Sequence, residues 1–236
     1  MNWMAGNYNY SKQLERQFAA LLGKIARRVN IYFYKYVDKD GFIKDIEGLK
    51  KALADYANKI EPWALKNCER LLKQIEAYNA RAFPAIIAKN ALAREYVMVA
   101  ARGLLREQVD LIKSLPLRAA ERAQSLAVEQ ALGGGRAAGI VSKIKESGDV
   151  TRNRALLIAR TELAKANATF TRARCDSSNV THYIWRTVGD VSVRHTHAEL
   201  DGKVFAFTDP PFIAGEGEHH PGEFPNCRCY AEPILK

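Results

Sequence analysis

The stretch TRARCDSSNVTHYIWRTV, residues 171–188, marks the point where the character of the chain changes. Its first part ends a long helical pattern, whereas Thr181–Val188 is rich in β-branched and aromatic residues that partly alternate, a pattern typical of a strand. Two further strands are predicted at Lys203–Phe207 and Cys229–Ile234, on either side of a loop rich in Gly, Pro and Glu. The sequence therefore predicts an α+β fold, with a mainly α-helical N-terminal two-thirds followed by a small α+β C-terminal module that holds a short antiparallel sheet.

Upstream of this stretch, the chain shows amphipathic helical patterns. Apolar residues recur at steps of three and four, which places them on one face of a helix. A turn is predicted at Asp38–Gly41, and Pro62 is suited to open the third helix. The three stripes consist of Leu14, Phe18, Leu21, Ile25, Val29, Tyr32 and Tyr36; of Ile46, Leu49, Leu53, Tyr56 and Ile60; and of Cys68, Leu71, Ile75 and Tyr78. They predict a helix bundle with an apolar core.

Prolines and glycines predict where the later helices end, because both are unfavourable inside a helix. Breaks are expected at Pro84, Pro116, Gly133–Gly135 and Ser147–Gly148. The helical pattern between them predicts helices over residues 84–116, 117–132, 136–146 and 152–174. Asp149 or Thr151 is expected to cap the N-terminus of the last of these helices. The three consecutive glycines do not form a phosphate loop, since the spacing and the Lys-Ser/Thr pair of such a loop are missing.

Composition and charge narrow the class of protein. The 236 residues are 47% hydrophobic and 26% charged, as in soluble globular proteins, and no apolar run approaches the roughly 20 residues of a membrane span. We expect no secretory signal, and the isolated Cys68 and Cys175 favour a reducing compartment over a disulfide framework. The net charge of +10 is uneven: residues 1–174 carry 31 Lys and Arg against 17 Asp and Glu, and residues 175–236 carry 5 against 9. The basic part could meet nucleic acid or an acidic protein surface, or could simply be a set of solvated helix faces.

The segment HHPGEFPNCRC, residues 219–229, concentrates the groups that could bind a metal ion. Zinc takes thiolate and imidazole ligands, but its usual knuckle is C-x₂₋₄-C rather than the C-x-C of Cys227 and Cys229. With His197 and either His219 or His220, a zinc site is chemically allowed. The alternatives are buried thiols in a closing strand, or a late disulfide that so short a loop makes uncommon. His195 and His197 would share one side of a strand but diverge on a helix.

Two readings of the nearby polar residues stay open. Asp190 and Arg194 could form an ion pair that pins a turn, followed by a second turn at Asp201–Gly202. In the catalytic reading, His197 would act as a general base near Asp190, or Asp190 or Glu199 would serve as acid or base beside a zinc ion. The chain lacks a local nucleophile motif such as G-x-S-x-G, so an enzyme is the minority interpretation.

Four motifs, taken in order, resemble the Mu F-like head-morphogenesis family of minor head proteins of tailed bacteriophages. They are DLIKSLP at residues 110–116, ALLIARTE at residues 155–162, W-R-T-x-x-D-x-x-x-R-x-x-H-x-x-L-D-G-K-V-F at residues 185–205, and P-G-x-x-P-N-C-R-C at residues 221–229. The resemblance covers roughly residues 100–233 and implies a head-morphogenesis domain over residues 100–236, with helices at 100–174 and a small β module at 180–236. Residues 1–99 would form a variable helical region.

This resemblance implies a structural protein in the phage head interior or at the portal vertex, present in the host cytoplasm during assembly, and not an enzyme. Its partners would be the portal protein and other head proteins, with packaged double-stranded DNA and its ejection as further candidates, and no membrane. A metal-dependent hydrolase or nuclease with a His/Cys zinc site is the alternative. The residues that match the family motifs are Arg160, Thr161, Glu162, Trp185, Asp190, Arg194, His197, Asp201, Gly202 and Arg228, besides the ligand candidates Cys227 and Cys229. Many relatives carry a His before P-N-C-R-C, where this chain has Phe224.

Overall fold

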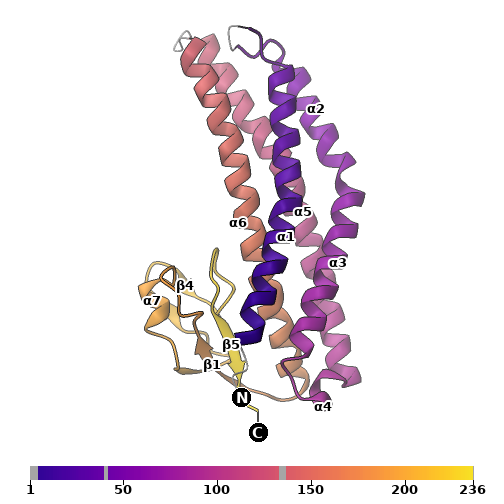
Figure 1. Cartoon of the computed structure of the whole chain (residues 1–236), viewed down its shortest axis with the longest axis vertical. Helices are drawn as coiled ribbons and strands as arrows, with labels where there is room; N and C mark the ends of the chain where they lie inside the picture. The colour runs from indigo at the N-terminus through magenta and orange to yellow at the C-terminus, as the bar shows by residue number, and fades with distance from the viewer. Residues whose placement is uncertain (1–4, 40–41, 133–136, 236) are drawn as a thin grey trace. The chain divides into compact units, whose positions relative to one another are not determined.

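The α+β architecture expected from the sequence is confirmed (Figure 1). The computed structural model describes residues 5–39, 42–132 and 137–235. The helices are α1 (Ala5–Lys35), α2 (Ile46–Lys59), α3 (Glu61–Ala80), α4 (Ala85–Ala88), α5 (Ala91–Ala131), α6 (Ala137–Ser177) and α7 (His195–Ala198). The strands are β1 (His182–Arg186), β2 (Val204–Ala206), β3 (Phe212–Ile213), β4 (Gly217–Glu218) and β5 (Tyr230–Pro233). Within the described ranges, no helix combines the length and the apolarity that a bilayer span would require.

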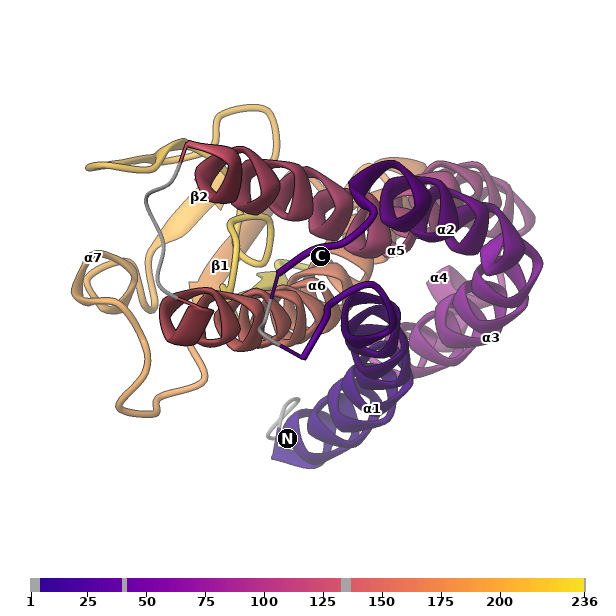
Figure 2. The same ribbon diagram turned by 90° about the horizontal axis from the view of Figure 1, so that it is seen from above.

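All three predicted strands form, and they pair with one another. The sheet has the order β2-β1-β5, and both pairings are antiparallel. The paired strands β1 and β2 are labelled in Figure 2. Tyr183 lies opposite Phe205, and Trp185 lies opposite Ala231. The loop between the second and third strands contains a further short hairpin, β3-β4, which the sequence pattern did not predict.

The chain divides into two compact units. One consists of residues 17–68 and 107–159, and the other of residues up to 16, residues 69–106 and residues from 160 onward. The helices α1, α3, α5 and α6 each contribute a segment to both units. We call them the bundle unit and the sheet unit.

The bundle unit is built from helical segments with buried apolar faces. Asp45 caps α2, because its carboxylate accepts the Gly48 N–H at 2.8 Å. The spacing of three and four predicted that Leu21 and Tyr32 of α1 face the core. The structure instead buries their neighbours Leu22 and Phe33, so the core-facing side is shifted by one residue at these two turns. Other core residues are Ile25, Val29, Leu49, Leu53, Ile112 and Leu115.

The break predicted at Pro116 is wrong, because α5 runs through it from Ala91 to Ala131. A proline inside a helix removes one backbone hydrogen bond and costs roughly 3 kcal/mol. Here the flanking turns bury Ile112, Leu115 and Ala119 in the core, which offsets that cost. The helix end predicted near residue 132 agrees with Ala131, whereas Gly133–Gly135 and Asp40–Gly41 lie outside the described residues.

The break predicted at Ser147–Gly148 is also wrong, because α6 is continuous from Ala137 to Ser177. Thr151 is no cap; its hydroxyl donates to the Ser147 carbonyl at 2.9 Å within the helix. A Cβ on Gly148 would lie 2.4 Å from the Asn30 side-chain nitrogen. This glycine therefore provides close helix packing rather than a helix end.

The sheet unit contains a buried polar network around Arg174. This guanidinium donates to Asn79 Oδ1 and to Glu76 Oε1, both at 2.5 Å, and Asn79 donates in turn to Thr171 Oγ1 at 2.8 Å. Burial lowers the pKa of Arg174, although Glu76 opposes the shift. These bonds tie α3 to α6 within the unit.

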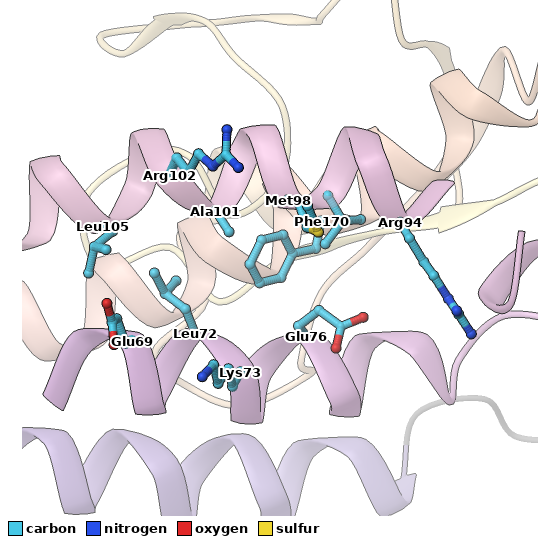
Figure 3. Close-up of a pocket in the computed structure, with 11 residues that line it drawn as sticks. Glu69, Leu72, Lys73, Glu76, Arg94, Met98, Ala101, Arg102, Leu105 and Phe170 are labelled. Carbon is cyan, nitrogen blue, oxygen red and sulfur yellow. The ribbon is translucent and has the colours of Figure 1, made fainter. Parts of the chain in front are cut away.

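A cavity of about 580 Å³ lies beside this network, between the α3 and α5 segments of the sheet unit. Leu72, Met98 and Leu105 line it, and Figure 3 shows the Phe170 ring lying between the two helices. Charged side chains surround the apolar lining: Glu69, Lys73, Glu76, Arg94 and Arg102. The sequence pattern did not indicate this cavity, because its walls come from helices far apart in the chain.

Candidate metal centre

The alternation of β1 positions the centre of the β module. Tyr183 and Trp185 point to the same side of the strand and are fully buried, whereas His182 is exposed. Around them lies a buried cluster formed by Phe83, Cys175, Phe207, Ile213, Cys227, Cys229 and Ala231. Strand β1 thus places the Trp185 ring in the centre of the module. The Trp185 ring meets the His197 ring edge-on, with 5.5 Å between the two ring centroids.

The short helix α7 separates the two histidines of the H-x-H motif. The His195 side chain is 89% exposed and pairs with Glu199 at 3.2 Å. His197, two residues later, faces inward and is 1% exposed. Of the two outcomes considered from sequence, the helical one applies, so only His197 belongs to the site.

His197 meets both cysteines of the C-x-C motif. Its Nδ1 lies 3.5 Å from Cys227 Sγ and 3.5 Å from Cys229 Sγ. The three donor atoms all lie within 4.8 Å of one another, and the cysteines are 2% and 6% exposed. All four cysteines of the chain are free thiols. Two sulfurs and one imidazole nitrogen therefore converge on one buried point.

The surroundings of Cys227 favour its thiolate form. The backbone N–H groups of Gly222 and Cys229 both donate to Cys227 Sγ at 3.4 Å. The hydrogen bond from Cys229 is the largest influence, and with those from His197 and the backbone it lowers the pKa of Cys227 to about 4, against the opposing effect of burial. By contrast, burial raises the pKa of Cys175 to about 12. The thiolate form is thus favoured at Cys227, whereas Cys175 stays a neutral thiol of the buried cluster.

Glu216 hydrogen-bonds the second ring nitrogen of His197. Its Oε2 lies 2.8 Å from His197 Nε2 and 3.0 Å from His219 Nε2. Burial opposes ionisation of this carboxyl, but the hydrogen bonds from His197 and His219 outweigh it and lower its pKa. The hydrogen bond with Cys227, followed by that with Glu216, raises the pKa of His197. The imidazole is therefore held between sulfur on one side and a carboxylate on the other.

The two adjacent histidines of the 219–229 segment have different roles. His219 lies next to Glu216 and His197. The His219 ring stacks on the Phe224 ring, with 5.1 Å between the two ring centroids. His220 Nδ1 instead hydrogen-bonds the Tyr183 hydroxyl at 3.0 Å. Of the two candidates named from sequence, His219 is the one beside His197.

Arginine–carboxylate pairs hold the segments around the site. Arg228 binds Asp190 through two bonds of 2.6 and 2.7 Å, and Arg194 pairs with Glu216 Oε1 at 3.2 Å. Arg194 also donates to the Pro225 carbonyl at 2.8 Å. The ion pair between Asp190 and Arg194 that the sequence suggested stays a prediction, while the structure pairs Asp190 with Arg228 and Arg194 with Glu216.

The α6 motif Arg160-Thr161-Glu162 lies against the 219–229 segment. Arg160 donates to Asn226 Oδ1 at 3.4 Å and to Glu15 at 3.0 Å, and Thr161 Oγ1 accepts the Asn226 N–H at 3.2 Å. Glu162 is buried. The expected turn at Asp201–Gly202 forms, with the Asp201 carboxylate accepting the Thr187 N–H at 2.7 Å. The motif residues from position 160 onward therefore all belong to the sheet unit.

Glycine is required at position 222 of this segment. Its φ is +91°, and a Cβ there would lie 3.3 Å from the Ala164 carbonyl, from Ala168 Cβ and from the Cys229 carbonyl. The backbone of the loop thus packs directly on α6. Through these contacts and the bond from the Asn226 N–H to Thr161, residues 219–229 hold the β module against α6 within the sheet unit.

Sequence reasoning missed Glu216 as part of the site. This residue lies in a loop with several glutamates, and only its spacing of three from His219 could have suggested a shared role. Glu199, which had been considered as an acid or base, pairs with the exposed His195 instead. The difference arises from the β3-β4 hairpin, which returns Glu216 to His197.

Comparisons with known proteins agree with the motifs. The family model described as "Phage Mu protein F like protein" matches residues 124–232, which include the whole of α6 and all of the sheet except the last residue of β5. An uncharacterized protein of Haemophilus influenzae is 34% identical over 127 residues, which cover 54% of this chain and 28% of the relative. The chain thus spans little more than a quarter of that relative's length. No solved structure matches. Residues 124–232 of this chain are therefore similar to the family described as phage Mu protein F like.

Proposed function

We propose that the protein is a structural minor head protein of a tailed bacteriophage that acts in head assembly at the portal vertex. The family match over residues 124–232 carries this proposal, since it indicates a protein of the phage head. We place the head-morphogenesis domain at residues 100–236 and a variable helical region at residues 1–99. The host cytoplasm would be its location during assembly and the virion its final one.

The structure supports a role in assembly rather than in chemistry. Long helices α5 and α6, of 41 residues each, expose several large apolar side chains along the chain, including Met98, Val99 and Val128. Exposed apolar side chains of this kind are available to neighbouring proteins in an assembly. The portal protein and other head proteins are the proposed partners.

Co-expression with the cognate portal protein tests the portal contact. We expect a complex that co-purifies through two steps and survives moderate salt. A matched control is co-expression with the major shell protein, which should give less complex if the portal is the specific partner. Separate elution of this protein and the portal at micromolar concentrations would refute the portal contact while leaving the family membership intact.

Packaged DNA is a further proposed partner, supported by the charge of residues 1–174. Phosphate contacts release counterions, so a DNA complex should weaken steeply as salt rises. For about six phosphate contacts, affinity for a double-stranded fragment should fall roughly 10³-fold between 50 and 200 mM salt. A flat response would remove DNA as a direct partner.

The alternative of a metal-dependent hydrolase or nuclease requires that a substrate reach the His/Cys cluster. His197, Cys227 and Cys229 are almost fully buried, which favours a structural use of these groups. A nuclease assay on plasmid DNA with zinc, magnesium and manganese tests this alternative. Cleavage that disappears in Cys227→Ser but not in Cys68→Ser would overturn the structural reading.

A further inference from the structure

The sulfur atoms of Cys227 and Cys229 both lie next to the same nitrogen of His197. Buried cysteines usually act as small apolar groups, as Cys68 and Cys175 do here. Cys227 and Cys229 differ, because their sulfurs converge on a ring nitrogen at equal distances of 3.5 Å. Two thiols and one imidazole form the donor set that Zn²⁺ prefers.

Two features beyond the three donors match a bound cation. The N–H groups of Gly222 and Cys229 point at Cys227 Sγ, which stabilises negative charge on that sulfur. Glu216 binds His197 Nε2 at 2.8 Å, on the opposite side of the ring from the sulfurs. A histidine that binds zinc typically donates its second N–H to a carboxylate in this way.

A second set of possible ligands shares His197. Its members are His197, Glu216 and His219, whose donor atoms also lie within 4.8 Å of one another. One imidazole cannot give both nitrogens to a single ion, so the sets exclude each other for that ion. The thiol set is the better zinc site, because thiolates bind zinc strongly and because Glu216 is then free to orient the ring.

We propose that His197 Nδ1, Cys227 Sγ and Cys229 Sγ bind one Zn²⁺ ion, with Glu216 as the residue that positions His197. Three protein ligands leave one tetrahedral position for a small ligand such as water. The ion joins α7 to the 219–229 segment, and through Gly222 and Asn226 that segment packs on α6. The zinc site is independent of the portal contact, since it depends only on residues of this module.

Elemental analysis of the purified full chain tests the proposal directly. Protein prepared in zinc-containing medium with a thiol reductant should hold about one zinc per chain. Cys227→Ser and Cys229→Ser should each lower the zinc content about tenfold or more after dialysis. Cys68→Ser is the matched control, since it makes the same substitution at another buried cysteine, and it should leave the zinc content unchanged.

X-ray absorption on the unsubstituted protein removes any dependence on how the variants fold. We expect two sulfur ligands near 2.3 Å and nitrogen or oxygen ligands near 2.0–2.1 Å. Glu216→Gln should keep both sulfur ligands and weaken zinc binding about 10- to 100-fold. A protein that takes up no zinc after reconstitution, or one whose zinc shows only nitrogen and oxygen ligands, would overturn the proposal; the latter result would assign the ion to the Glu216 and His219 set.

Discussion

Substitution of Gly222 by alanine should loosen the contact between the 219–229 segment and α6. Alanine at φ +91° costs about 1–2 kcal/mol, because side chains rarely adopt this conformation. The added Cβ would also lie 3.3 Å from two backbone carbonyls and one methyl group, and relief of such crowding costs about 1–3 kcal/mol. We therefore expect Gly222→Ala to lower the free energy of unfolding of the sheet unit by about 2–5 kcal/mol.

The matched control is Gly215→Ala. Gly215 has a similar φ of +79°, but a Cβ there would meet no atom within 4 Å, so only the conformational cost of about 1–2 kcal/mol remains. Urea unfolding can be followed by Trp185 emission after Trp3→Phe and Trp63→Phe, since the chain has three tryptophans. Equal losses in the two glycine variants, within about 0.5 kcal/mol, would show that the loop does not pack on α6 as described.

Other expectations concern the polar network, the ion pairs, the helices and the metal. In urea titrations, Asn79→Ala should lower the free energy of unfolding by about 1–3 kcal/mol, because Asn79 is buried and hydrogen-bonds Arg174 and Thr171. The control Asn58→Ala, at an exposed position, should change the free energy of unfolding by less than about 0.5 kcal/mol. Arg228→Met should cost about 1–3 kcal/mol through the lost pair with Asp190, and Asp190→Asn in the same background should add little further loss in a double-mutant cycle. In thermal unfolding, Gly103→Ala should stabilise the protein by about 1 kcal/mol, because a Cβ at this position of α5 meets no neighbouring atom. Gly148→Ala should give no such gain, because its Cβ would displace the Asn30 amide. Equal gains in stability from the two variants would contradict the close packing at Gly148. In the Trp3→Phe and Trp63→Phe background, removal of zinc by a chelator should lower the midpoint of unfolding followed by Trp185 emission, and addition of Cys227→Ser should abolish that effect.

The fold class and the three sheet strands could be predicted from the sequence, because β-branched and aromatic alternation is a local property. The ends of the long helices could not. Pro116 and Gly148 are unfavourable in an isolated helix, but the buried faces around them and the close approach of Asn30 depend on distant segments. Tertiary packing therefore outweighs the local preference at both positions.

The site was predictable to the extent that its residues belong to motifs. His197, Cys227 and Cys229 were named from the motif and do meet in space. The partners of Asp190 and Arg194 were not predictable, because they depend on how the loops between α7 and β5 return. Glu216 is one of several glutamates in a loop rich in Gly and Pro, its spacing of three from His219 is its one distinguishing sequence feature, and the β3-β4 hairpin brings it to His197.

Mass spectrometry of purified phage heads tests the proposed function most directly. The heads should come from the phage or prophage that encodes this chain, and they should be separated from soluble protein by density gradient. We predict peptides of this protein in the head fraction at a few copies per portal, together with the portal protein itself. Heads that contain the portal and the shell protein but no peptides from residues 124–232 would contradict the assignment of this chain as a structural head protein.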